Sequence, residues 1–192
     1  MPAVARILIV GGGCPGRRLA ELMVAQGHAV RATTRSEARR SAIEATGAEC
    51  WVGTPDRLAT LRGALENVTI ACWMLARASA SEGELAALHS SRLEFFLGQA
   101  IDTTVRGLIY DARPAHATER EAEQATELRR PGDRRPSRAM LGEGASIFRS
   151  LTELNSIPSV VLGEGAAGAE DGERTWLTEA QEAVESLLDR RR

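Results

Sequence analysis

The chain has 192 residues, 43% of them hydrophobic, and that length suits one domain with its own core. Its formal net charge of -2 lacks the basic excess of nucleic-acid-binding proteins, and no apolar run reaches the ~20 residues of a membrane-spanning helix. We therefore expect a single domain over residues 1–192 without a nucleic-acid or membrane partner, and, since no signal-peptide pattern is present, a cytoplasmic protein.

The first part of the chain alternates strand and helix patterns. Residues 6–10 (RILIV) form a continuous apolar run, which is typical of a strand buried on both faces. Apolar residues then recur at helical spacing over 16–26, and Gly27 supplies a helix stop. A second strand is predicted at 28–35 and a helix at 36–47, begun by a serine and ended by a glycine.

The alternation continues to residue 112. A third strand is predicted at 48–53, followed by a helix at 54–67 that opens with the sequence Thr-Pro-Asp. The apolar stretch 68–76 reads as a fourth strand. A serine and a glutamate three residues apart form a capping box for a helix at 81–99, and 105–112 is a fifth strand.

The remainder is more polar. Residues 114–140 are dense in charge and read as a helical and loop insertion, followed by a helical stretch ending near Leu154 and a sixth strand at 157–163. The C-terminal helix, 174–192, carries an apolar face around Trp176, which packs either on the chain's own sheet or on a second copy in a homo-oligomer. Repeated strand–helix units predict an α/β fold with a doubly wound parallel sheet of about six strands.

A glycine motif follows the first strand directly. Gly11, Gly13 and Gly16 match GxGxxG at the point where a strand passes into a helix, with Cys14 and Pro15 inside the turn. Gly11 would make the tight turn, Gly13 would let the backbone approach a pyrophosphate, and Gly16 would let helix and strand pack closely. The pyrophosphate would sit at a helix N-terminus, which favours anions. The pattern therefore predicts a dinucleotide cofactor.

The end of the second strand bears on which dinucleotide binds. NAD sites carry Asp or Glu there for the ribose 2′-hydroxyl, whereas this chain has Arg35, with Ser36 next and Arg39 or Arg40 one helical turn later. Guanidinium and hydroxyl groups suit a 2′-phosphate, and Glu37 falls inside the predicted helix. We therefore expect NADP in preference to NAD.

The counts of reactive residues exclude several kinds of site. Cys14, Cys50 and Cys72 are far apart, as are the three histidines, so we expect neither a disulfide framework nor a metal site. All 24 residues of the Lys+Arg total are arginine, so the chain contains no lysine. Any mechanism that needs a lysine is therefore excluded for this chain.

Residues 6–112 resemble the short-chain dehydrogenase/reductase superfamily, in particular its atypical and extended branch of epimerase-like and NmrA-like NAD(P)-binding Rossmann proteins. The resemblance rests on "ILIVGGGCPGRRLAELMVAQGHAVRATTR" and on the strand stretches around 51, 73 and 110. It implies that Thr54 and Asp56 flank the adenine. It also implies that Trp73 and Leu75 line the ribose and nicotinamide side of the cofactor.

The chain departs from that family at the catalytic residues. Family enzymes use a Tyr-x-x-x-Lys pair, and the single tyrosine here, Tyr110, falls in a predicted buried strand. Asp111, at the end of that strand, and His116 remain as a candidate acid/base pair. Three alternatives stay open: a cofactor-responsive sensor or interaction module, an NADPH-dependent reductase with a non-standard proton donor, and a scaffold without cofactor.

Overall fold

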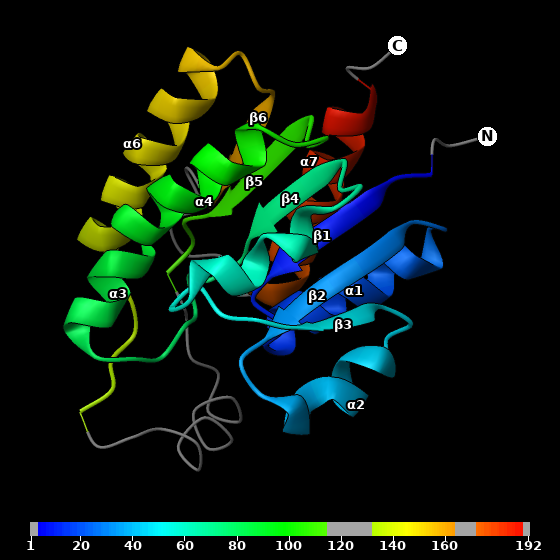
Figure 1. Ribbon diagram of the computed structural model, residues 1–192, viewed down its shortest axis with the longest axis horizontal. Helices are drawn as coiled ribbons and strands as arrows, with labels where there is room; N and C mark the ends of the chain where they lie inside the picture. The colour runs from blue at the N-terminus through cyan, green and yellow to red at the C-terminus, as the bar shows by residue number, and fades with distance from the viewer. Residues whose placement is uncertain (1–3, 115–131, 164–171, 190–192) are drawn as a thin grey trace.

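The computed structural model describes residues 4–114, 132–163 and 172–189 (Figure 1). Six strands form one sheet in the order β3-β2-β1-β4-β5-β6, and every neighbouring pair is parallel. The strands are β1 (Arg6–Val10), β2 (Ala29–Thr34), β3 (Glu49–Val52), β4 (Ile70–Trp73), β5 (Gly107–Asp111) and β6 (Ser159–Leu162). The predicted doubly wound α/β fold is confirmed.

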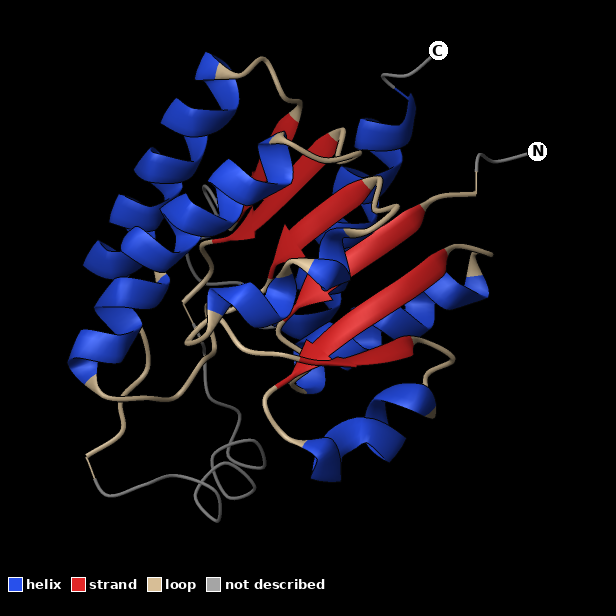
Figure 2. Ribbon diagram, in the orientation of Figure 1, coloured by secondary structure: helices blue, strands red, loops and turns tan. Residues whose placement is uncertain are grey.

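Helices cover both faces of the sheet (Figure 2). The α-helices are α1 (Cys14–Ala25), α2 (Arg40–Glu44), α3 (Glu82–Leu88), α4 (Ser91–Ile101), α6 (Arg138–Leu154) and α7 (Gly172–Asp189). The 3-10 helices are η1 (Glu37–Arg39), η2 (Leu58–Leu61) and η3 (Gly63–Leu65). Core side chains of α1, α2 and α7 pack on one face, and those of η2, η3, α3, α4 and α6 pack on the other.

Alternating residues of each strand feed two separate cores. In β1, Ile7 and Ile9 face α1 and α7, whereas Leu8 and Val10 face the opposite layer. All four side chains are fully buried, because both faces of a parallel sheet are covered by helices. This is why the strand reads as a continuous apolar run.

The apolar face of the C-terminal helix is buried within the chain. Trp176, Ala180, Val184 and Leu187 are each at most 3% exposed and pack in the core formed by α1 and the sheet. Of the two alternatives for this face, packing on the chain's own sheet is the one observed. No helix among the described residues is long and apolar enough to cross a bilayer.

The predicted capping residues act as expected at two helices, but two of the predicted helices differ in length. Ser81 and Glu84 form the expected capping box, and Gly27 adopts the left-handed conformation (φ +88°) after α1. The helix expected over 81–99 divides into α3 and α4 around His89 and Ser90. The helix expected over 36–47 is shorter, consisting of η1 and α2.

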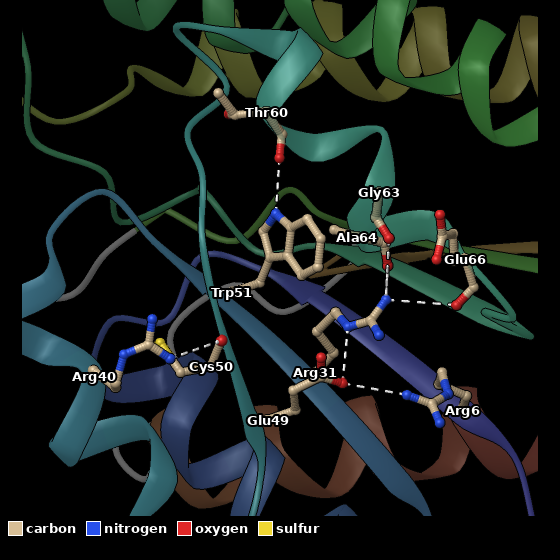
Figure 3. Close-up of polar contacts among 10 residues, drawn as sticks. All are labelled: Arg6, Arg31, Arg40, Glu49, Cys50, Trp51, Thr60, Gly63, Ala64 and Glu66. Atoms are coloured by element: carbon tan, nitrogen blue, oxygen red, sulfur yellow. Dashed lines mark hydrogen bonds and ion pairs between the residues drawn. The ribbon is translucent and has the colours of Figure 1, made fainter.

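The α-helix expected over 54–67 is wrong, since the segment forms η2 and η3 instead. Figure 3 shows that side chains from β2 and β3 bind carbonyl groups of this segment. The indole N–H of Trp51 donates to the carbonyl of Thr60 (2.7 Å), and the Arg31 guanidinium donates to those of Gly63 (3.3 Å) and Ala64 (2.7 Å). Because these carbonyls accept hydrogen bonds from side chains outside the segment, they do not need the N–H partners that an α-helix would supply.

Arg31 is a buried charge with several partners. It is 7% exposed, and its Nε lies 3.0 Å from the Glu49 carboxylate, which also accepts from Arg6 at 3.2 Å. The guanidinium carbon stands 5.1 Å from the centre of the Trp51 ring. Carbonyls, a carboxylate and an aromatic face together compensate for the loss of water around this cation.

Candidate functional site

The glycine turn lies at the carboxyl edge of the sheet, where β1 stands between β2 and β4. The N–H of Gly12 donates to the carbonyl of Thr33 (2.8 Å), and the N–H of Gly11 donates to the Thr33 hydroxyl (3.2 Å). On the other side, the N–H of Met74 donates to the carbonyl of Val10 (2.9 Å). Strands β2 and β3 lie on one side of β1, and β4, β5 and β6 lie on the other. This edge is therefore the topological switch point, where open α/β sheets bind ligands.

Close backbone approach explains three of the glycines. Gly11 has a φ of +118°, and a Cβ there would lie 2.5 Å from the carbonyl oxygen of Met74. A Cβ on Gly16 would overlap the carbonyl oxygen of Gly11, because the first turn of α1 packs directly on the loop. Gly12, which the sequence motif does not single out, is equally confined against Thr33.

Gly13 differs from the other glycines of the turn. The nearest atom to a Cβ built on it is Pro15 Cδ, at 4.0 Å, so this side of the loop is open. Gly13 is also the N-cap of α1, and no side chain caps the helix there. Cys14, the first residue of α1, is exposed. A helix start without a side-chain cap and without acidic residues in its first turn attracts anions.

The arginines after β2 divide into two kinds. Arg35 and Arg39 are exposed, and their guanidinium groups bond to no residue that the structure describes. Arg40, by contrast, pairs with Glu37 and Glu44. Beside them, the exposed Ser36 accepts a hydrogen bond from the N–H of Ala38 (3.3 Å) as the cap of η1.

Thr54 and Asp56 form hydrogen bonds with each other and with neighbouring residues of the chain. The Thr54 hydroxyl donates to the Asp56 carboxylate (3.0 Å), and the Asp56 carboxylate pairs with Arg92 of α4. Thr54 was expected to begin a helix, but it forms a tight turn closed by an isolated bridge to Arg57. Arg92 carries no motif in the sequence, since its role depends on how α4 packs against this loop.

The side chain of Trp73, a residue expected beside the cofactor, points into the core. Trp73 is 1% exposed and its ring packs 4.9 Å from that of Phe96, in the core beneath α4. Leu75, two residues later, is partly buried and lies beside the glycine turn, its Cδ2 3.1 Å from where a Gly11 Cβ would stand. Of the two, only Leu75 borders the turn.

Asp111 ends β5 at the same edge of the sheet and is 3% exposed. Burial raises the pKa of its carboxyl to about 6. Smaller effects lower this pKa, and they come from the Arg113 N–H, the Trp176 indole and the charges of Arg77 and Arg113. The carboxylate accepts from the Arg113 N–H at 3.1 Å. A carboxyl that titrates near neutrality at a strand end is suited to acid/base work.

The residues around Asp111 tie α7 to the sheet. Arg113 pairs with Glu179 of α7, which also accepts a hydrogen bond from the N–H of Gly163 at 2.8 Å. His116, the proposed partner of Asp111, lies outside the described residues. Among those residues, no three histidine, cysteine or acidic side chains gather as a metal site would require.

Tyr110 is a core residue, as the strand pattern predicted. It is fully buried, and its hydroxyl lies 2.8 Å from Nδ1 of His89 and donates to the carbonyl of Leu141 (3.3 Å). Burial raises the pKa of Tyr110 and lowers that of His89 to about 4, so both groups are neutral at pH 7. Their position in the core suits packing between β5 and α6.

No family model and no curated protein matches the sequence. Solved structures of similar fold include UDP-glucose 4-epimerase from Thermotoga maritima (TM-score 0.60, 14% identity, 81% of this chain and 54% of that chain). They also include vestitone reductase from alfalfa (TM-score 0.56, 12% identity, 82% and 55%). UDP-glucuronic acid 4-epimerase from Bacillus cereus, solved with NAD, gives a TM-score of 0.58, 12% identity, and coverage of 81% and 55%.

The chain spans about half the length of the solved structures it matches. At identities of 12–14% the likeness establishes the fold alone.

Proposed function

We propose that this chain binds NADP, in preference to NAD, at the turn formed by Gly11, Gly13 and Gly16. The observation that carries the proposal is the shape of this turn. Gly11 and Gly16 allow backbone contacts that a side chain would block, and Gly13 leaves the side toward the helix start open. A backbone cradle at the switch point of a doubly wound sheet is where a dinucleotide pyrophosphate binds.

The groups around the turn fit the rest of that cofactor. The first turn of α1 would hold the pyrophosphate, and Leu75 would border the cofactor on the β4 side. Arg35 and Arg39, both exposed after β2, would hold the 2′-phosphate, for which paired guanidinium groups are well suited. No acidic residue stands at the position of Arg35, where an NAD site carries one.

The protein would act as a cofactor-responsive sensor or interaction module. The chain has no lysine, and its single tyrosine lies in the core, so the Tyr-x-x-x-Lys pair of the family it resembles is missing. Binding without turnover is the simplest function that these residues support.

A second candidate function, an NADPH-dependent reductase, is favoured by one observation. Asp111 is a buried carboxyl at the carboxyl end of β5 with a pKa raised to about 6, so it can hold a proton near neutral pH. When bound, the reduced nicotinamide supplies a hydride, and Asp111 would donate the proton.

Cofactor titration tests the first proposal. NADPH and NADH are titrated against the protein while tryptophan fluorescence is recorded, in parallel with Arg35→Ala. We expect the substitution to weaken NADPH binding about tenfold and leave NADH unchanged, because only NADPH offers the 2′-phosphate. Arg62→Ala is the matched control, since Arg62 is exposed between η2 and η3 and its removal changes the net charge equally. Failure of both cofactors to bind at millimolar concentration contradicts the proposal.

Turnover separates the two functions. NADPH oxidation is followed with a panel of aldehydes and ketones, with Asp111→Asn as the comparison. Carbonyl-dependent oxidation that the substitution abolishes, with cofactor affinity intact, supports the reductase. Binding without oxidation of any substrate leaves the sensor or interaction module.

A further inference from the structure

We propose that Arg40 sets the cofactor preference of this site by holding the carboxylate of Glu37 away from the ribose position. The inference rests on the proposed function and deepens it. Glu37 is the acidic residue nearest to Arg35 in the chain, and it stands two residues after it. A carboxylate that could reach this region would favour the 2′-hydroxyl of NAD and repel the 2′-phosphate of NADP.

Arg40 binds Glu37 through two nitrogen atoms. Its Nε pairs with one carboxylate oxygen of Glu37, and its Nη2 donates to the other oxygen at 3.0 Å. A planar guanidinium matched to both oxygens of a carboxylate fixes the direction as well as the charge of the acid. The Glu37 carboxylate is therefore committed to Arg40.

Two further acceptors anchor the arginine itself. Nη1 of Arg40 lies 3.3 Å from the Glu44 carboxylate and donates to the carbonyl of Cys50 at 3.3 Å. The Cys50 contact directs the guanidinium to strand β3, as Figure 3 shows. Glu37 is therefore paired with an arginine that also contacts β3, whereas Arg35 follows directly after β2.

The charges near the site explain why the Arg40–Glu37 pair affects cofactor preference. Arg35 and Arg39 carry the positive charge offered to a ligand, and the hydrogen bond from Arg40 lowers the pKa of the Glu37 carboxyl. Without Arg40, the carboxylate of Glu37, which lies between Arg35 and Arg39 in the sequence, would lose its pair and could compete with a ligand for these arginines. Because the side chains of Arg40 and Glu37 are 39% and 68% exposed, the pair contributes little to stability and its loss leaves the fold intact.

Four variants test the inference: Arg40→Gln, Glu37→Gln, the double variant, and Glu44→Gln as a control that leaves the Glu37 pair in place. Dissociation constants for NADPH and NADH are measured for each by fluorescence titration, and thermal unfolding is recorded beside them. We expect Arg40→Gln to lower the ratio of NADPH to NADH affinity about fivefold. We expect the double variant, which has the same net charge as the unsubstituted protein, to restore that ratio.

The outcomes separate this inference from the function beneath it. Failure of the unsubstituted protein to bind either cofactor overturns the proposed function and this inference with it. Normal binding with an unchanged ratio in Arg40→Gln overturns the inference alone. A ratio that stays low in the double variant also overturns it, because the loss would then come from the charge of Arg40 and not from release of Glu37. Unfolding temperatures that match across the four variants exclude a structural cause.

Discussion

The backbone N–H of Gly12 lies 2.8 Å from the carbonyl oxygen of Thr33, so the glycine turn after β1 is tied to the end of β2. The same turn contacts Met74 after β4 on its other side. Its shape is therefore fixed by two neighbouring strands before any ligand arrives, and substitutions in it separate folding from binding.

We expect Gly16→Ala to destabilise the protein by at least about 2 kcal/mol, because the new Cβ meets the backbone carbonyl of Gly11 and not a movable side chain. Gly13→Ala is the matched control, since the same methyl group there enters open space. Urea unfolding measures both. Equal stability of the two variants contradicts the packing described here. NADPH titration of Gly13→Ala, which we expect to bind more weakly, separately tests the proposed cofactor site.

Arg31→Met removes the cation that binds the carbonyls of Gly63 and Ala64. We expect a loss of about 2–4 kcal/mol in the free energy of unfolding, because buried carbonyls and the Glu49 carboxylate lose their partner. Arg6→Met is the control. It removes a 37%-exposed partner of the same carboxylate, and an exposed pair contributes at most about 1 kcal/mol. If the two variants unfold at the same denaturant concentration, Arg31 does not hold this segment.

Asp111 makes stability depend on pH. Its pKa is about 6 in the folded protein and 3.8 when unperturbed, so between those values the folded state holds a proton that the unfolded chain has lost. The stability from this group is therefore present at about pH 4 and is lost as the pH rises to 6. We expect Asp111→Asn to gain about 3 kcal/mol relative to the unsubstituted protein between pH 4 and pH 7. Unfolding curves across that range measure the difference, and a constant difference rejects the assignment.

His89 acts in the opposite direction over an overlapping range. Burial lowers its pKa to about 4 from 6.5, so as the pH falls the unfolded chain takes up a proton before the folded state does. Stability from this group is lost as the pH falls from 6.5 toward 4. We expect His89→Gln to reduce acid sensitivity in the same unfolding series. The two substitutions are therefore expected to change the pH dependence of stability in opposite directions, and each serves as a control for the other.

Gly144 lets helix α6 approach the ring of Tyr110. A Cβ at this position would overlap the Tyr110 hydroxyl and lie 2.9 Å from the carbonyl oxygen of His89. We expect Gly144→Ala to cost about 1–3 kcal/mol and Tyr110→Phe to relieve part of that cost in the double variant. Gly142→Ala in the same helix meets nothing within 4 Å, so we expect it to be neutral or stabilising by up to about 1 kcal/mol. Thermal unfolding measures the stability of all four variants, which are Gly144→Ala, Tyr110→Phe, the double variant and Gly142→Ala.

The sequence predicted the sheet well because burial on both faces leaves a simple signal. All six expected strands are present, and the glycine motif stands where its spacing placed it, between β1 and α1. The strand ends were less accurate. The stretch 68–76 was expected to be strand throughout, whereas β4 is Ile70–Trp73. Met74 and Ala76 are buried in the loop beyond it, so their apolar character does not mark a strand.

The error over residues 54–67 arises because long-range contacts leave no local pattern in the sequence. The helix signals after Thr54 are real, but Arg31 and Trp51 bind the carbonyls of that segment from outside it. Trp73 was placed beside the cofactor by the family resemblance, which does not reveal on which face of the sheet its ring lies. The structure places its ring in the core with Phe96.

The way in which Arg31 holds η3 has a consequence for how this region can diverge. The arginine contacts carbonyl oxygens, which every amino acid carries, so this interaction does not itself require particular side chains at the residues that provide them. Related proteins could therefore exchange the exposed residues of this segment while keeping its path, provided that the arginine, the confined glycine and the buried apolar positions stay. Saturation mutagenesis would show tolerance at the exposed positions of the segment and intolerance at one distant residue in β2.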